Sequence, residues 1–305
     1  MTCIRMYEGI STSLTSTVNY LQLLETYQED VQLRLHTERR VNQPTDNINA
    51  YMKSEAFNSY NQEIEGAQEQ LALGIQLVSS TQTAIDSIEG TLETMMSLTE
   101  LALEEDDAST REALGTKFND LAEQLYSMAK DANYGDSNLL HDESSSGTQE
   151  DLTLYLFDEQ SISLPAINFN GPPDNEEQVT LTMGDVNDPT TYSFSLAGDG
   201  ANAVDWGSDE YKEVLGSLMT DLEEMKSGIS IYENQLGNSG VFLELRESYN
   251  EKLANNYESV SDGLTLADLN EEAASSLAIQ TAQSISLQTI SLLSSTSDMR
   301  LQMLM

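Results

Sequence analysis

Basic residues are scarce in this sequence. Its 305 residues include 13 Lys and Arg against 52 Asp and Glu, which gives a formal charge of −39 at pH 7. The phosphates of nucleic acid and the anionic surface of a membrane are both bound by clustered Lys and Arg. We therefore expect no nucleic-acid partner and no membrane partner.

Cysteine and histidine are also scarce, which removes the usual basis of redox and metal sites. The single Cys3 cannot form an internal disulfide, and His36 and His141 lie far apart, outside any zinc-ligand spacing. The sequence has no GxxxxGK[ST] or GxGxxG loop, so a nucleotide would lack its phosphate cradle. We expect no metal, no cofactor and no catalytic residues.

The acidic stretch "GDGANAVDWGSDE" is the best candidate for a calcium site or a catalytic carboxylate pair. It gathers Asp199, Asp205, Asp209 and Glu210, but it lacks the D-x-[DN]-x-[DN]-G order of an EF-hand. A peptidase or glycosidase in this region has no His cluster to support it. We interpret the stretch as a solvated acidic loop and predict that the protein is not an enzyme.

Long apolar runs are missing too. The first residues, "MTCIRMYEGISTSLTSTVNYLQLLET", lack the apolar run of roughly 7 to 15 residues that marks a secretory signal. No segment reaches the about 18 apolar residues of a membrane span. We expect no membrane insertion. If the protein is exported, we expect a route that does not depend on a cleavable signal peptide.

Apolar residues at helical spacing dominate what is present. A first amphipathic helix is indicated by Ile10, Leu14, Leu21, Leu24, Val31 and Leu35. After a break at "RRVNQPTDN", one row repeats every seven residues at Ile64, Leu71, Val78, Ile85 and Leu92. A matching row follows late in the chain at Leu215, Leu222, Ile229, Leu236 and Leu243. Rows of this period predict a mainly α fold in which long, coiled-coil-like N- and C-terminal helices pair.

The middle of the chain changes character. A third helix is marked by Phe118, Leu121, Leu125 and Met128, and "NYGDSN" supplies the residues that end it. The alternating runs "LTLYLF", "QVTLTM" and "TYSFSL" then predict strands separated by turns. We expect a small inserted β-rich domain.

The last helix is apolar on more than one side. One face carries Leu269, Leu277, Ile285 and Leu292, while Leu287, Ile290 and Leu293 lie on another. Such a helix is unfavourable in water unless a partner covers it.

Three separated stretches resemble bacterial flagellin, in the form found in alphaproteobacteria. "RRVNQPTDN" resembles the family's R-I-N-[SR]-x-x-D-D segment, and "LAEQLYSMAKDANYGDSNLL" resembles the helix with its F-N-G-x-x-L-L turn. "LTLADLNEEAASSLAIQTAQSISLQTISLL" resembles the carboxy-terminal segment with its A-D-x-N-E-E motif. The three stretches occur in the family's order, and the likeness covers most of the chain outside residues 145–208.

The resemblance implies an elongated rod whose many copies polymerise into the helical filament used for swimming. It divides the chain into five segments: a filament-core helix at 1–45, the two halves of a helical rod domain at 46–144 and 209–260, a variable β-rich outer insert at 145–208, and a second filament-core helix at 261–305. It also implies an extracellular location after type III export, contacts with hook-associated and cap proteins, and an export chaperone on the C-terminal helix. The related hook–filament junction protein is the alternative, because Pro44 in "NQPTDN" resembles that family slightly more.

The segment "RRVNQPTDN" carries our predictions for individual residues. By itself it could be a plain connector, in which Asp46 or Thr45 caps the following helix. The family's L-S-[ST]-G before the arginine is here "LHTE", and Asn47 replaces the second Asp, so local capping or subunit contacts differ. We expect Arg39 or Arg40 to pair with a carboxylate of a neighbouring subunit or of the last helix, such as Glu271 or Glu272. The candidate subunit-interface residues are Arg39, Arg40, Asn42, Asp46, Leu14, Leu21, Leu24, Leu269, Leu277, Ile285 and Leu292.

Overall fold

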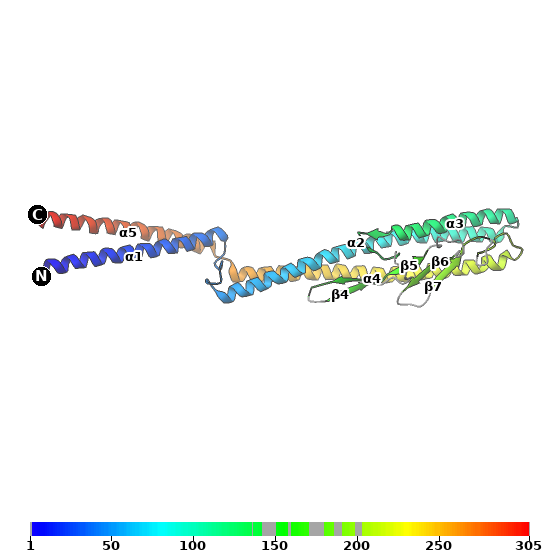
Figure 1. Ribbon diagram of the computed structural model, residues 1–305, viewed down its shortest axis with the longest axis horizontal. Coiled ribbons are helices and arrows are strands. Elements are labelled where there is room, and N and C mark those ends of the chain that lie inside the picture. Colours follow the sequence, from blue (N-terminus) through cyan, green and yellow to red (C-terminus); the bar gives the residue numbers. More distant parts are fainter. Residues whose placement is uncertain are drawn as a thin grey trace. The chain divides into compact units, whose positions relative to one another are not determined.

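In the residues that it describes, the computed structural model has five long helices and seven short strands (Figure 1). The structure describes residues 2–135, 137–141, 151–157, 160–170, 180–185, 191–198 and 203–304. The helices are α1 Thr2–Thr37, α2 Ile48–Glu104, α3 Ala108–Asp131, α4 Tyr211–Thr265 and α5 Leu269–Leu304. The predicted mainly α fold with a small β insert is confirmed.

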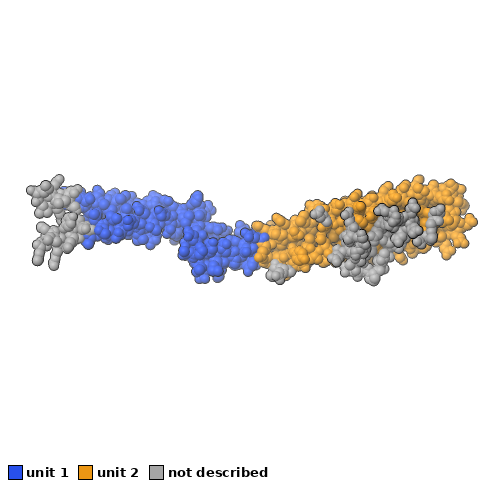
Figure 2. Space-filling model, viewed as in Figure 1, with its two compact units in different colours: residues 1–62, 254–305 blue, residues 63–253 orange. Residues whose placement is uncertain are grey.

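The chain forms two compact units (Figure 2). Unit 1 contains Met1–Gln62 with Ala254–Met305, and unit 2 contains Glu63–Leu253. Both units therefore combine residues from the two halves of the chain. The five-segment division given by the resemblance stays a prediction.

The core of unit 2 is the seam that the seven-residue rows predicted. On α2, Leu71 and Leu92 are fully buried, and on α4 Leu222 and Leu236 are buried in the same hydrophobic cluster. A seven-residue spacing keeps successive side chains on one side of a helix, so two such rows can face each other along their whole length. The predicted long helices are confirmed.

Helix α3 begins and ends where local sequence signals place it. Asp107 is the N-cap, and its Oδ2 accepts hydrogen bonds from the backbone N and Oγ1 of Thr110, at 2.9 and 2.8 Å. These bonds hold the pKa of Asp107 below its usual value. At the other end the helix stops at Asp131, and Gly135 then turns the chain with φ +65°.

The insert consists of small antiparallel sheets. β1 Asn133–Tyr134 pairs with β2 Ser137–Asn138, and β3 Leu152–Tyr155 pairs with β4 Ser161–Leu164. A three-stranded sheet has the order β5-β6-β7, with bounds Ile167–Asn170, Thr180–Asp185 and Thr191–Ser195. The runs "LTLYLF" and "TYSFSL" contain β3 and β7, and β6 begins within "QVTLTM" and extends beyond it to Asp185, so all three predicted strands are present. We did not predict β4 and β5, because "SISLPAINFN" is interrupted by Pro165 and shows no long alternation.

A buried arginine joins the α2–α3 connection to the segment that precedes α4. Arg111 is only 3% exposed and lies in the first turn of α3. Its guanidinium donates to the carbonyls of Glu105, Asp106, Trp206, Gly207 and Ser208, at 2.8 to 3.4 Å. The guanidinium also stacks on the Tyr211 ring, 3.7 Å from its centroid. We call this arrangement the Arg111 clamp.

One seam position of α4 breaks the apolar row. Asn250 lies seven residues after Leu243 and is fully buried, and neither amide atom has a hydrogen-bond partner in the part of the chain that the structure describes. Leaving a buried amide unpaired costs about 1–3 kcal/mol. The seam is therefore weakened at this position.

We expect an Asn250→Leu variant to be more stable than the wild type. Leucine continues the row of Leu236 and Leu243 and removes the unpaired amide, so the free energy of unfolding should rise by about 1–3 kcal/mol. Thermal unfolding followed by circular dichroism measures this change. The matched control is Leu236→Asn, which should lower the melting temperature. A lower melting temperature for Asn250→Leu would contradict the assignment.

Candidate functional site

The segment that sequence analysis singled out lies in unit 1, where the two halves of the chain meet. We call residues 38–47 together with 264–268 the joint. Arg39 pairs with Leu266 in an isolated antiparallel bridge. Arg40 N donates to Thr265 O at 2.8 Å, and Ala267 N donates to Glu38 O at 2.9 Å. These backbone bonds tie the end of α1 to the α4–α5 connection.

The joint begins with a backbone conformation that most side chains avoid. Glu38 has φ +60°, and it directly follows α1. The left-handed conformation commonly ends helices and is normally supplied by glycine, because a Cβ there costs roughly 1–2 kcal/mol. Here it turns the chain so that Glu38 O faces Ala267 N. The departure "LHTE" from the family pattern therefore falls on the residue whose backbone is left-handed.

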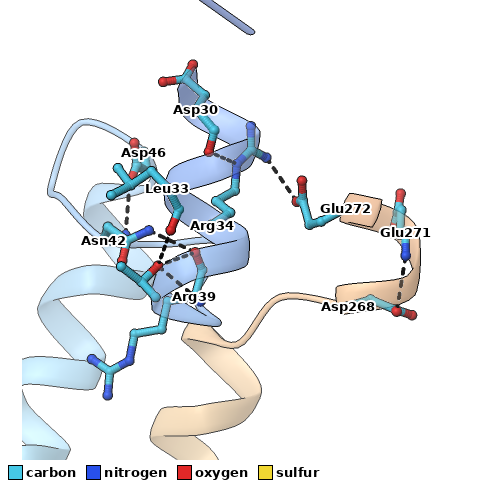
Figure 3. A network of polar contacts seen from close by, with 10 residues as sticks. Asp30, Leu33, Arg34, Arg39, Asn42, Asp46, Asp268, Glu271 and Glu272 are labelled. Carbon is cyan, nitrogen blue, oxygen red and sulfur yellow. Dashed lines mark hydrogen bonds and ion pairs between the residues drawn. The ribbon is translucent and has the colours of Figure 1, made fainter. Parts of the chain in front are cut away.

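The loop at 42–46 is closed by a carboxylate. Asp46 Oδ2 accepts hydrogen bonds from Asn42 N and Gln43 N, at 2.9 and 3.0 Å. Asn42 Nδ2 in turn donates to Arg39 O at 2.8 Å (Figure 3). Asp46 and Asn42 therefore give the loop its shape.

Our prediction that Asp46 or Thr45 caps the following helix is wrong. Asn47 does so, because its Oδ1 accepts from Ala50 N at 3.1 Å, and α2 begins at Ile48. The carboxylate of Asp46 is already engaged by the two N–H groups on the other side of the loop. An Asn accepts such a bond as well as an Asp does, so the Asp-to-Asn departure from the family pattern keeps the cap.

We expect Asp46→Ala to lower the free energy of unfolding of unit 1 by about 1 kcal/mol, because two backbone N–H groups lose a charged acceptor. Thr45→Ala is the matched control and should be close to neutral. Chemical denaturation of both variants measures the difference. Equal stability of the two would show that Asp46 does not hold the loop.

The ion pair next to the joint uses a different arginine from those we predicted. Arg34 Nη1 lies 3.3 Å from Glu272 Oε1, and the Arg34 Nε donates to Asp30 O at the same distance. In Figure 3, the Arg39 side chain points away from Glu272. Arg40 instead donates through Nη2 to Leu264 O, at 3.2 Å. Within the chain, the predicted pairing of Arg39 or Arg40 with Glu272 is therefore wrong, while pairing with a neighbouring subunit stays a prediction.

We did not predict a role for Arg34, because it precedes the motif "RRVNQPTDN" and we expected the partner of Glu271 or Glu272 to be an arginine of that motif. Arg34 lies three residues after the buried Val31, next to the side of α1 that packs against α5. A cation at that position could have been paired with the acidic first turn of α5, where Glu271 and Glu272 follow the Asp268 that caps it. Acidic side chains in a first turn are stabilised by the N-terminal end of the helix dipole.

A hollow of about 240 Å³ lies beside the loop of the joint, lined by Asp30, Leu33, Arg34, Arg40, Asn42 and Asp46. Its two carboxylates and two guanidiniums balance in formal charge. In the described part of the chain, no group of three or more His, Cys, Asp or Glu residues could hold a metal ion. The described contacts of the joint are structural: they link backbone segments and fix helix ends.

The apolar candidates separate into two sets. On α1, Leu24 is buried and Leu14 and Leu21 are half-buried, on the side that packs against α5 within the chain. On α5, the predicted residues are exposed to solvent: Leu269, Leu277, Ile285 and Leu292. Figure 1 shows α1 and α5 running side by side. The first set therefore holds the pair of helices together, and the second set is open to contact.

None of the described helices is long and apolar enough to cross a membrane.

Comparison with known proteins gives one family. The family model of the bacterial flagellin N-terminal helical region matches residues 10–145. A flagellin from Brucella melitensis biotype 1 is 22% identical over 269 residues, which cover 88% of each chain.

Two solved structures are more distant. Bacillus cereus flagellin is 14% identical with a TM-score of 0.42, covering 60% of this chain and 88% of that one. A Vibrio parahaemolyticus protein described as a flagellar hook-associated protein is 11% identical with a TM-score of 0.48, covering 72% of this chain and all of that one. At these TM-scores the two structures support no conclusion about the chain.

Proposed function

The chain belongs to the bacterial flagellin family, and we propose that it acts as the structural subunit of a flagellar filament, polymerising helically with many copies of itself. The observation that carries this proposal is the surface of α5. Leu277, Ile285 and Leu292 are 66%, 59% and 67% exposed, although α5 already packs against α1 along its other side. Large apolar side chains in such a row favour burial against a partner.

The outer side of α1 is apolar as well. Tyr20, Leu23 and Tyr27 are each about half exposed. A pair of helices that is apolar both at its seam and on its outer sides can be buried completely only between copies. Burial of that surface would offset the entropy lost when the subunits are ordered.

The joint supports a role at the boundary of the filament core. Its backbone bonds tie α1 to the start of α5, so the two terminal helices enter the assembly as one pair. Arg39 and Arg40 are exposed there, in a chain of net charge −39. We propose that these two arginines meet a carboxylate of a neighbouring subunit, and that Asn42 and Asp46 belong to the same contact surface.

Location and partners follow from the family at a coarse level: an extracellular flagellar filament that polymerises and contacts hook-associated proteins. The finer points are part of our proposal. The exposed stripe of α5 is the surface that an export chaperone would have to cover before assembly. A cap protein would act on growing ends, and a polymer of this kind needs no catalytic activity, nucleic acid or membrane insertion.

Electron microscopy of the purified chain tests the function directly. On addition of short filament seeds, the chain should elongate into helical filaments of uniform diameter, and filaments sheared from cells should contain it. A folded chain that adds to no seed would overturn the proposal.

A hook–filament junction protein is the second candidate, favoured by Pro44 in the loop of the joint. Such a protein would form about a single ring at the hook tip, whereas a flagellin is present in thousands of copies. Quantifying the chain in sheared filaments against hook protein separates the two. A ratio near that of a ring would assign the chain to the junction.

A further inference from the structure

A second apolar surface lies in unit 2, on one side of α4. Val241, Phe242, Leu245 and Tyr249 are 67%, 51%, 67% and 53% exposed, and they recur at helical spacing. Phe242, Leu245 and Tyr249 line a hollow together with Arg246 and Lys252, and Val241 precedes them on the same helix. We call these six residues the α4 face. Four large apolar side chains gathered on one exposed helix face mark a contact surface.

The α4 face carries two of the chain's few cations. The Arg246 guanidinium lies 5.3 Å from the centre of the Tyr249 ring and donates to Gln160 Oε1, which helps to hold it at the surface. Lys252 lies about one turn beyond Tyr249 and is exposed. On the same helix, Lys226 is engaged by Glu93 at 2.6 Å. An apolar surface with two cations therefore stands out on a chain of charge −39.

An acidic groove lies next to the α4 face. It has a volume of about 590 Å³ and is formed by both long helices of unit 2. Five of its lining residues are glutamates: Glu65, Glu69, Glu244, Glu247 and Glu251. The remaining lining residues are Gln68, Ala72 and Ser248, so Ala72 gives the groove apolar surface between its carboxylates.

The α4 face and the acidic groove lie at the same level along α4 but on different sides of the helix. With 3.6 residues per turn, positions 244, 247 and 251 fall on a different side of α4 from positions 242, 245 and 249. The third side carries the buried Leu243 and Asn250. A copy that docks through its α4 face consequently keeps its own acidic groove open for the next copy.

We propose that the α4 face of one copy docks on the acidic groove of the next copy. Charge complementarity selects this occupant, because Arg246 and Lys252 meet five glutamates while the apolar residues cover the groove's apolar floor. Different surfaces of the two copies are used, so the contact is heterologous and generates an open series instead of a closed pair. This inference rests on the proposed function and adds the lateral contact of unit 2 to the contacts of α5.

Two charge-reversed variants test the pairing. Lys252→Glu puts a carboxylate on the face, opposite the glutamates of the groove, and Glu247→Lys with Glu251→Lys puts two ammonium groups in the groove, opposite Arg246 and Lys252. Each variant alone sets like charges against each other, so seeded elongation should slow by about tenfold or more. A one-to-one mixture should recover, because the carboxylate introduced at position 252 of the first variant meets the two lysines introduced in the groove of the second, and the unchanged surfaces fit each other.

Controls separate docking from folding. All three substituted residues are exposed, so circular dichroism and the melting temperature should stay at wild-type values. Lys212→Glu, an equal change of charge on α4 outside the face, should elongate normally. Leu245→Ser provides a second route, because it removes an exposed apolar contact without changing charge and should also slow elongation.

The outcomes distinguish this inference from the proposed function. Wild-type chain that fails to add to seeds would overturn the function itself. Wild-type chain that elongates, with variants that elongate equally well, would leave the function standing and assign the α4 face to a different partner. Variants that fail alone and also fail when mixed would likewise overturn the pairing.

Discussion

Replacing Arg111 with methionine should lower the free energy of unfolding of unit 2 by about 3 kcal/mol or more. The five carbonyls of the Arg111 clamp would lose a charged donor in a buried or partly buried site, and an acceptor left unpaired in such a site costs up to about 1–3 kcal/mol. Methionine fills a similar volume, so the loss would report hydrogen bonds more than a cavity. Chemical denaturation followed by circular dichroism measures it.

The substitution should also have a local signature. The clamp holds residues 206–208 against the α2–α3 connection, and Trp206 packs on Phe118 of α3 with ring centroids 5.3 Å apart. Without the clamp this segment would open more readily, so a protease should cut near Gly207 faster than in the wild type. Trp206 is the only tryptophan of the chain, and its fluorescence reports the same opening.

Two variants serve as controls for the clamp. Arg111→Lys keeps the charge but loses the planar fork of five donors, so it should fall between the wild type and Arg111→Met. Lys117→Met removes a cation from an exposed position of α3 and should be nearly neutral. An Arg111→Met variant as stable as Lys117→Met would show that the clamp does not stabilise unit 2.

A triple variant of α5, with Leu277, Ile285 and Leu292 changed to serine, should abolish filament formation. Full burial of one such side chain contributes about 1.5–3 kcal/mol, so three together remove about 5 kcal/mol or more from each subunit's contacts. In the single chain these residues are exposed, and their loss should change the stability of the folded monomer little. Seeded elongation measured by light scattering, with electron microscopy of the products, gives the result.

The control for this variant lies on the same helix. Gln280→Ser with Gln288→Ser changes two exposed polar positions of α5 and should leave elongation unchanged. Unfolding of unit 2 should be the same in both variants and in the wild type. Normal filaments from the triple variant would mean that the exposed row of α5 is not buried in the assembly.

The predictions that depended on local pattern were the ones that the structure confirmed. The seven-residue rows containing Leu71 and Leu222 predicted long helices, and the turn residues after Asp131 predicted the end of α3. Such signals lie within a few turns of chain, where backbone preference and side-chain spacing decide the outcome. The short strands β4 and β5 had no comparable signal, and their pairing depends on partners such as β3 and β6.

At the joint, local signals pointed to the right segment but to the wrong contacts. The proline and the Asp, Asn and Thr residues of "RRVNQPTDN" indicated a break with a helix cap, and a break with a cap is present there. The choice of Asn47 over Asp46 depended on where the loop places the Asp46 carboxylate. Several residues in a short loop can accept the same kind of bond, so composition alone could not rank them.

By itself, the sequence determined the long helices, their seven-residue seams and the chain's acidic charge, because these are properties of residue order and composition. Only the tertiary structure decided which cation meets Glu272, which residues close the Arg111 clamp and which apolar residues of α5 remain exposed. All three depend on how α5 returns along α1, or on where the segment before α4 meets α3. Contacts between residues so far apart in the chain follow from packing, and a pattern of neighbouring residues does not contain them.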